Sequence, residues 1–320
     1  GTDTCSTMSE VKVDEANADE DGFQGLSLPK SGADDLLKAE AETQAMNDIA
    51  NIMRRTQGVK EKLSTTTFAP RMAQWASGAA APPATAPPPV FAAINAKNKE
   101  QVIGHIEEAL AAGACGIFLV NNNFDYPQLL PIVRSVRAQM PTVFLGVNFS
   151  MMSGSDSFPI LGRLAREGVK VDAFWADNAC MEHEMQAQPV ADNIKAARDA
   201  AGWDGLYFGG VAVRNPKNNV KLCKAVPAEK LKDVATSSVG YMDVVATSGP
   251  EGAVAPDESK VANMREGCGT TPLCLATTGM TAEDLRALKG QVDAFILQMD
   301  DAQTTPELDV DMLKLLVQGC

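Results

Sequence analysis

Short hydrophobic runs and longer amphipathic stretches alternate along the chain from residue 90 to the C-terminus. The runs are rich in β-branched and aromatic residues, which is typical of buried strands, whereas the stretches between them carry apolar residues at helical spacing. The runs cover residues 90–95, 116–121, 142–148, 173–177, 206–213, 242–247, 273–277 and 294–298. The helical stretches lie near residues 99–112, 126–139, 157–168, 185–201, 227–238, 257–267, 282–290 and 306–318.

This alternation predicts the fold class. Strands separated by helices imply parallel pairing with right-handed crossovers, and eight such units in one domain predict a closed (β/α)8 TIM barrel. A doubly wound open sheet is the alternative, but the glycine-rich dinucleotide motif expected after its first strand is missing.

The chain before residue 89 follows a different pattern and predicts an extended arm. Apolar residues at helical spacing predict one amphipathic helix at about 33–55, and the Pro/Ala-rich residues 76–89 predict a linker. We therefore expect an N-terminal arm at residues 1–88 and the barrel at residues 89–320. The candidate partner-binding residues of the arm are Leu37, Ile49, Ile52, Met53 and Trp75.

Charge and cysteine content narrow the possible partners and compartments. The formal net charge is −13, which argues against a nucleic-acid binder, and residues 1–45 alone hold eleven acidic against three basic residues. No apolar run approaches the ~18–20 residues of a membrane span. Seven cysteines at irregular spacing, without a C-x-x-C pair, favour a soluble reducing compartment over a disulfide framework.

The residues after each predicted strand are candidates for chemistry, because barrel sites lie at the C-terminal ends of the strands. Three of these residues can transfer protons and are the candidate catalytic residues: Asp177, Asp125 and Lys97. The candidate ligand-binding residues are amides, hydroxyls, glycines and one guanidinium: Asn95, Asn121, Asn148, Arg214, Thr247, Ser248, Gly249, Thr277, Thr278 and Gly279.

Phosphate and metal sites have weaker support. Residues 277–281 supply half of a barrel phosphate site, but Asp300 and Asp301 follow the eighth run and would repel a phosphate. Residues 180–184 hold Cys, His and two Glu, yet no second His or Cys pair accompanies them. We therefore predict no metal and no cofactor.

Four motifs together resemble the BtpA family. The segment 113–127, with Asn121, Asn122 and Asp125 after its strand, resembles that family's second strand and loop; residues 141–148, 243–252 and 272–283 resemble three further motifs in the same order. The resemblance covers the barrel and not the arm. It implies a (β/α)8 fold, and it implies either a role in the biogenesis or stability of photosystem I or the binding of phosphorylated or sugar-like small molecules. The chain departs from the family pattern at Asn121 or Asn122, where the family has Glu, and after the eighth strand.

Two functions therefore stay open. The first is a non-catalytic accessory or assembly subunit of a larger complex, with photosystem I as the suspected partner of the arm, in the plastid stroma and peripheral to the thylakoid; a cytoplasmic location is the alternative. The second is an enzyme or binder of a phosphorylated or polyhydroxylated small molecule at the barrel mouth, with Asp177 as a base.

Overall fold

A computed structural model describes residues 88–97, 99–122, 125–150, 152–184, 186–213, 226–249, 255–277, 281–288, 290–298 and 310–318. The predicted arm lies outside these ranges with Leu37, Ile49, Ile52, Met53 and Trp75, so its helix, its linker and the domain boundary stay predictions. Arg214, Thr278 and Gly279 also lie outside them.

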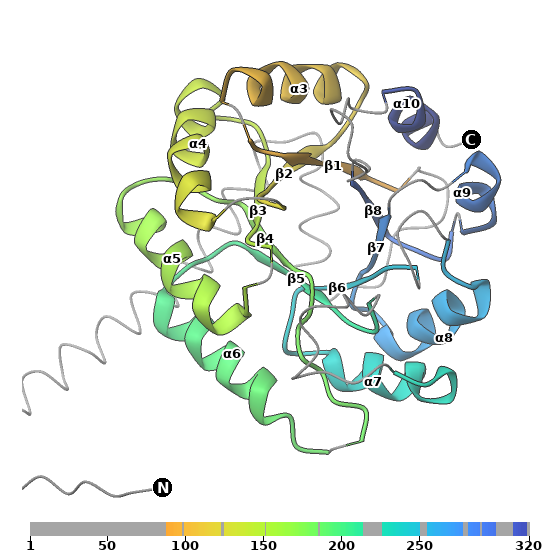
Figure 1. The fold of residues 1–320 in the computed structure, drawn as a ribbon. Coiled ribbons are helices and arrows are strands. Elements are labelled where there is room, and N and C mark those ends of the chain that lie inside the picture. The colour runs from red at the N-terminus through yellow and green to blue at the C-terminus, as the bar shows by residue number, and fades with distance from the viewer. Residues whose placement is uncertain are drawn as a thin grey trace, which may run out of the picture. The chain divides into compact units, whose positions relative to one another are not determined.

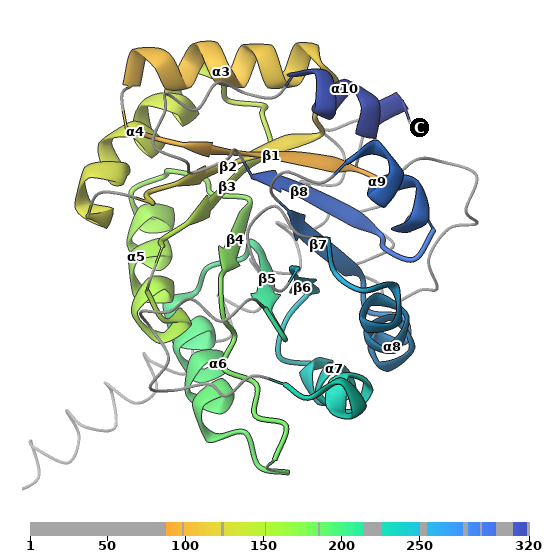
Figure 2. The same ribbon diagram turned by 45° about the vertical axis from the view of Figure 1, so that its right-hand side comes forward.

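The described chain forms a closed barrel of eight parallel strands, each followed by a helix, as the sequence predicts (Figures 1 and 2). The strands are β1 (Val90–Asn95), β2 (Gly116–Val120), β3 (Leu145–Asn148), β4 (Ala173–Ala176), β5 (Leu206–Gly210), β6 (Val244–Thr247), β7 (Leu273–Thr277) and β8 (Ala294–Gln298). The helices are α3 (Lys99–Ala111), α4 (Tyr126–Gln139), α5 (Gly154–Arg166), α6 (Pro189–Ala201), α7 (Leu231–Ser238), α8 (Glu258–Cys268), α9 (Ala282–Leu288) and α10 (Val310–Gln318), and a short 3-10 turn, Ala228–Lys230, precedes α7.

Some strands are shorter than the hydrophobic runs that predict them. β3 begins at Leu145 instead of residue 142, because the Arg137 guanidinium donates to the carbonyls of Pro141 and Val143 and holds this approach in a turn. β5 ends at Gly210 instead of residue 213, since Ala212 adopts a left-handed backbone with φ of 49° that a strand cannot continue through.

The barrel has two apolar layers that meet at the strands. The interior is filled largely by aromatic rings, and Phe118 packs edge-on against Phe91, Phe208 and Trp175 with centroids 5.3–6.1 Å apart. Gly146 leaves room for this packing, because a Cβ there would lie 2.3 Å from the Phe118 ring. The barrel is therefore a packed core, closed to ligands below its mouth.

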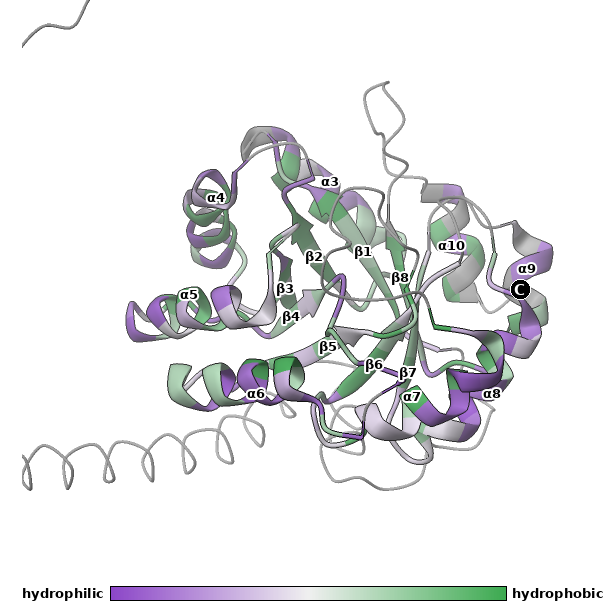
Figure 3. Ribbon diagram, turned by 60° about the horizontal axis from the view of Figure 1, so that its bottom comes forward, coloured by the Kyte–Doolittle hydropathy of each residue, from purple (hydrophilic) through white to green (hydrophobic). Residues whose placement is uncertain are grey.

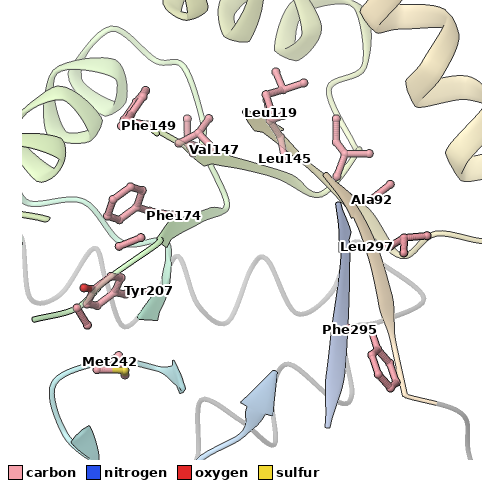
Figure 4. Packing of buried hydrophobic residues seen from close by; sticks show 14 of the residues in the cluster. Ala92, Leu119, Leu145, Val147, Phe149, Phe174, Tyr207, Met242, Phe295 and Leu297 are labelled. Carbon is pink, nitrogen blue, oxygen red and sulfur yellow. The ribbon is translucent and has the colours of Figure 1, made fainter. Parts of the chain in front are cut away.

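The second layer lies between the strands and the surrounding helices. Leu119, Val147, Phe174 and Tyr207 point outward from the strands into it (Figure 4). Hydropathy follows the same division, with apolar strands at the centre and polar residues on the outer faces of the helices (Figure 3). None of the described helices is long and apolar enough to cross a membrane.

Three matching Arg–Asp clamps lie where pairs of strands begin. In each, an arginine near the end of a helix binds an aspartate immediately before an even-numbered strand, and the same carboxylate accepts the backbone N–H of the preceding strand. The clamps are Arg137–Asp172–Leu145, Arg198–Asp243–Tyr207 and Arg265–Asp293–Leu273. They repeat every two strands, and Cys115 occupies the equivalent position before β2.

Candidate functional site at the barrel mouth

Alternation along the strands determines which residues face the barrel axis. Phe91 and Ala93 of β1 pack in the interior, as do Phe118 and Val120 of β2, so the next inward position of β1 is Asn95. Asn95 pairs in register with Val120, which in turn pairs with Asn148 at the end of β3. Asn95 and Asn148 therefore both occupy inward positions, at the C-terminal ends of the two strands that flank β2.

Asn148 is joined to Asp177, which lies two positions beyond the interior Trp175 of β4. Its amide Nδ2 donates to Asp177 Oδ1 over 2.7 Å, and Asn148 itself is 1% exposed. This bond fixes the orientation of the Asn148 amide, because its oxygen would be repelled by the carboxylate. A polar cluster of Asn95, Asn148 and Asp177 thus lies above the aromatic core.

Two oxygens of this cluster are buried without a hydrogen-bond donor. They are Asn95 Oδ1 and Asn148 Oδ1. Buried amide oxygens are almost always satisfied in folded proteins, and an unsatisfied one costs about 1–3 kcal/mol. Their presence at the ends of β1 and β3 is the outstanding chemical feature of the described part of the mouth.

The loop after Asp177 is held tightly against β5. The Ala179 N–H donates to the Gly210 carbonyl over 2.7 Å, and Asn178 Oδ1 accepts from the Cys180 N–H. Gly210 permits this close approach, because a Cβ there would lie 2.0 Å from the Asp177 carbonyl oxygen. The backbone that carries Asp177 is therefore rigidly positioned.

His183 lies further along the same loop. Its side chain is 6% exposed and Nδ1 has no partner, while Nε2 lies 4.0 Å from Glu184. Gln188 closes this part of the loop by binding both the N–H and the carbonyl of Glu182. Among the described residues no group of three or more His, Cys, Asp or Glu side chains is arranged to hold a metal ion.

Lys260 of α8 reaches the mouth at the exits of β5 and β6. The hydrophobic pattern did not identify it as a residue of the mouth. Its Nζ donates to the carbonyls of Ala212 and Ser248, over 2.5 and 2.6 Å, and so ties the exits of β5 and β6 together. Burial lowers the pKa of Lys260 to about 8. Its reach depends on how α8 packs, which the hydrophobic pattern does not specify.

Other predicted residues lie around this cluster in different settings. Thr247 and Thr277 are buried at outward-facing positions of β6 and β7, and Thr247 Oγ1 lies 3.4 Å from the Ala212 carbonyl as a donor. Asn121 is also outward-facing, and its Oδ1 accepts from the Ser150 N–H. Lys97 and Asp125 are exposed on the loops after β1 and β2.

Ser248 and Gly249 follow β6 beside Lys260. The Ser248 hydroxyl donates to the Gly249 carbonyl over 3.2 Å, and its own carbonyl accepts from Lys260. The structure thus brings Asn148 and Asp177 together, and it places Asn95 at the end of β1 and Ser248 and Gly249 at the β6 exit.

Comparison with known proteins supports the barrel assignment. A type I 3-dehydroquinate dehydratase from Clostridium difficile matches with a TM-score of 0.50 at 13% sequence identity, covering 73% of this chain and 93% of that one. A phosphoribosyl anthranilate isomerase from Thermus thermophilus matches with a TM-score of 0.45 at 13% identity, covering 72% and 97%. No family model and no curated protein sequence matches this chain.

The closed barrel of eight parallel strands, together with the likeness to the dehydratase, defines the class of protein as a TIM barrel. At such low identity a shared barrel shows the fold and does not transfer an activity. The resemblance to BtpA proteins stays a prediction from the sequence.

Proposed function

We propose that this protein binds a small polar molecule at the C-terminal mouth of its barrel and acts on it with Asp177 as the proton-transferring group. The observation that carries this proposal is the pair of buried oxygens, Asn95 Oδ1 and Asn148 Oδ1, that no donor satisfies. They belong to strand ends, where TIM barrels hold their ligands, and one of the two amides orients Asp177.

A purely structural account explains this cluster poorly. Leucine would fill a buried position at the mouth without leaving an oxygen unsatisfied. Two unsatisfied amide oxygens therefore lower the free energy of unfolding. Unsatisfied buried acceptors of this kind are typical of binding and catalytic sites, where a ligand supplies the missing hydrogen-bond donors.

Asp177 suits a role in proton transfer because it is positioned from two sides. Asn148 donates to its carboxylate, and the backbone that follows it is bound to β5. A carboxylate held in this way at a binding site can accept a proton from a ligand hydroxyl or carbon acid.

The test is a ligand screen with matched variants. Thermal unfolding of the full chain would be followed with millimolar sugars, polyols, amino sugars and their phosphates, and calorimetry would measure the affinity of each compound that stabilises it. We expect at least one compound to bind, Asn148→Leu to reduce its affinity at least tenfold, and Asp125→Asn to change it by less than about twofold, since a well-formed polar contact contributes on the order of 1.4 kcal/mol or more. Binding by no compound, or binding indifferent to Asn148→Leu, would contradict the proposal.

The accessory-subunit function rests on the BtpA resemblance and on the arm. A suspected association with photosystem I, a location in the plastid stroma and peripheral membrane contact all follow from that resemblance and stay predictions. Deleting residues 1–88 and following co-purification from photosynthetic membranes would test them, and an unchanged association would remove the arm from the hypothesis.

A further inference from the structure

We infer that the ligand of this mouth is a polyhydroxylated compound, uncharged or cationic, and that a phosphate group weakens its binding. This inference rests on the proposed function and specifies its ligand. It follows from which hydrogen-bonding groups the mouth leaves open and from which groups it has already used.

The open groups are acceptors. Asn95 and Asn148 each have a buried oxygen without a donor, and the Asn148 amide is bound to the carboxylate of Asp177. A ligand that satisfies them must bring O–H or N–H donors, and a carboxylate at the same place favours neutral or positive groups over anions. A sugar or polyol carries several hydroxyls that can donate to both oxygens, which belong to the ends of the two strands that flank β2.

Among the described residues at the exits of β5 and β6, the strongest donor is already engaged. Lys260 is the cation that an anionic ligand would seek, but its Nζ is bound to the carbonyls of Ala212 and Ser248. Drawing it toward a phosphate would leave both carbonyls without that donor and would separate the β5 and β6 exits.

Three of the described helix N-termini, those of α5, α8 and α9, also hold a carboxylate of their own. In TIM barrels a phosphate commonly binds at such N-termini near the last strands. Here Asp284 Oδ2 accepts from the N–H and the hydroxyl of Thr281 at the start of α9, and Asp257 Oδ1 accepts from the Ser259 N–H at the start of α8. At α5, Ser153 bonds to the Asp156 carboxylate while its hydroxyl caps the helix.

These carboxylates change what the mouth can recognise. Each occupies donors that a phosphate would use, and each adds a negative charge near the place where that phosphate would sit. The sequence predicted half of a phosphate site at residues 277–281. In the structure the Thr281 N–H of that segment already donates to the carboxylate of Asp284.

The test uses compounds that differ only by a phosphate. Calorimetry on the full chain would compare glucose with glucose 6-phosphate, glucosamine with glucosamine 6-phosphate, ribose with ribose 5-phosphate and myo-inositol with inositol 1-phosphate. We expect at least one unphosphorylated member to bind, its ester to bind at least tenfold more weakly, and Asn95→Leu to abolish the binding. Asn193→Leu, the same change on the exposed face of α6, is the matched control and should leave the affinity within twofold.

The outcomes separate this inference from the function on which it rests. If the ester binds more tightly in every pair that binds, and Asn148→Leu weakens that binding, the inference is overturned and the mouth remains the binding site. If no member of any pair binds at millimolar concentration, the proposed function fails and the inference fails with it.

Discussion

At the scale of single residues, Asn95 links stability to binding. Its Oδ1 is buried without a donor, so replacing the amide by an apolar group of similar size removes an unsatisfied acceptor. We expect Asn95→Leu to raise the free energy of unfolding of the free protein by about 1 kcal/mol while it removes ligand binding, a trade-off typical of functional positions. Urea unfolding together with calorimetry checks both effects; a destabilised variant that still binds would contradict the role given to Asn95.

The contact between Asn148 and Asp177 leads to a second prediction, which concerns how the stability of an Asn148→Asp variant depends on pH. Asn148→Asp would place two carboxylates at the separation where Nδ2 and Oδ1 now lie 2.7 Å apart, and such a pair cannot ionise fully. One folded-state pKa is then raised above its unfolded value, so the variant binds more protons when folded and loses stability as pH rises from about 4 to about 7. Unfolding measured at both ends of this window, for the variant and the wild type, should show a difference that grows with pH. A constant difference would mean that the two side chains do not interact.

The contribution of Lys260 to stability changes with pH in the opposite direction from that of the Asn148→Asp pair. Burial lowers its pKa from 10.5 to about 8, so between these values the unfolded chain holds a proton that the folded protein has released. The contribution of Lys260 to the unfolding free energy therefore increases with pH across this window, by up to about 3 kcal/mol relative to Lys260→Met. Urea unfolding of both proteins between pH 7.5 and about 10 measures it, and parallel pH profiles would show that the ammonium is not held as the structure places it.

At the scale of elements, the three clamps predict where the barrel is sensitive. Arg137 and Asp172 are 10% and 6% exposed, and the Asp172 carboxylate also accepts the Leu145 N–H. Asp172→Ala leaves a guanidinium and a backbone donor without this partner, and we expect a loss of about 3 kcal/mol. Glu167→Ala breaks the neighbouring Arg134–Glu167 pair, in which both side chains are 38% exposed, and should cost less than about 1 kcal/mol. Equal losses in chemical denaturation would remove the distinction between clamp and surface pair.

The elements themselves were largely predictable from the sequence. All eight strands and eight helices lie in the predicted order because each hydrophobic run must be buried on both faces of a parallel sheet. Their ends were less predictable: α5 begins at Gly154 instead of residue 157, because Ser153 caps it and accepts from the Asp156 N–H. Such limits depend on caps and clamps that the hydrophobic pattern does not contain.

The candidate site was predictable as a set of strand ends and not as an arrangement. In strands buried on both faces, the sequence does not show which residues point inward. Asn121 and Thr277 were therefore as strong candidates for ligand binding as Asn148 until the structure showed which face each occupies. Lys260 was missed for a related reason, since it reaches the mouth from the first turn of α8. The acidic helix caps, by contrast, could have been found from the pairs Ser153–Asp156 and Thr281–Asp284, which have the spacing of a capping box.

At the scale of the whole molecule, the groups proposed to hold the ligand belong to the barrel alone. Asn95 ends β1, Asn148 ends β3 and Asp177 follows β4, and their positions result from strand pairing and from bonds within residues 90–298. The predicted arm contributes none of the groups in this argument. Binding at the mouth and any association through the arm are therefore expected to be separable properties of one chain.

A chain shortened to residues 88–320 tests this separation. We expect it to unfold in one cooperative transition and to bind the ligand found for the full chain with an affinity within about twofold, because the strand-end acceptors, the clamps and Lys260 are all retained. The full chain, the shortened chain and the shortened chain with Asn95→Leu would be compared by thermal unfolding and calorimetry. Loss of binding on shortening, with the unfolding transition intact, would show that residues 1–87 contribute to binding and would contradict the separation.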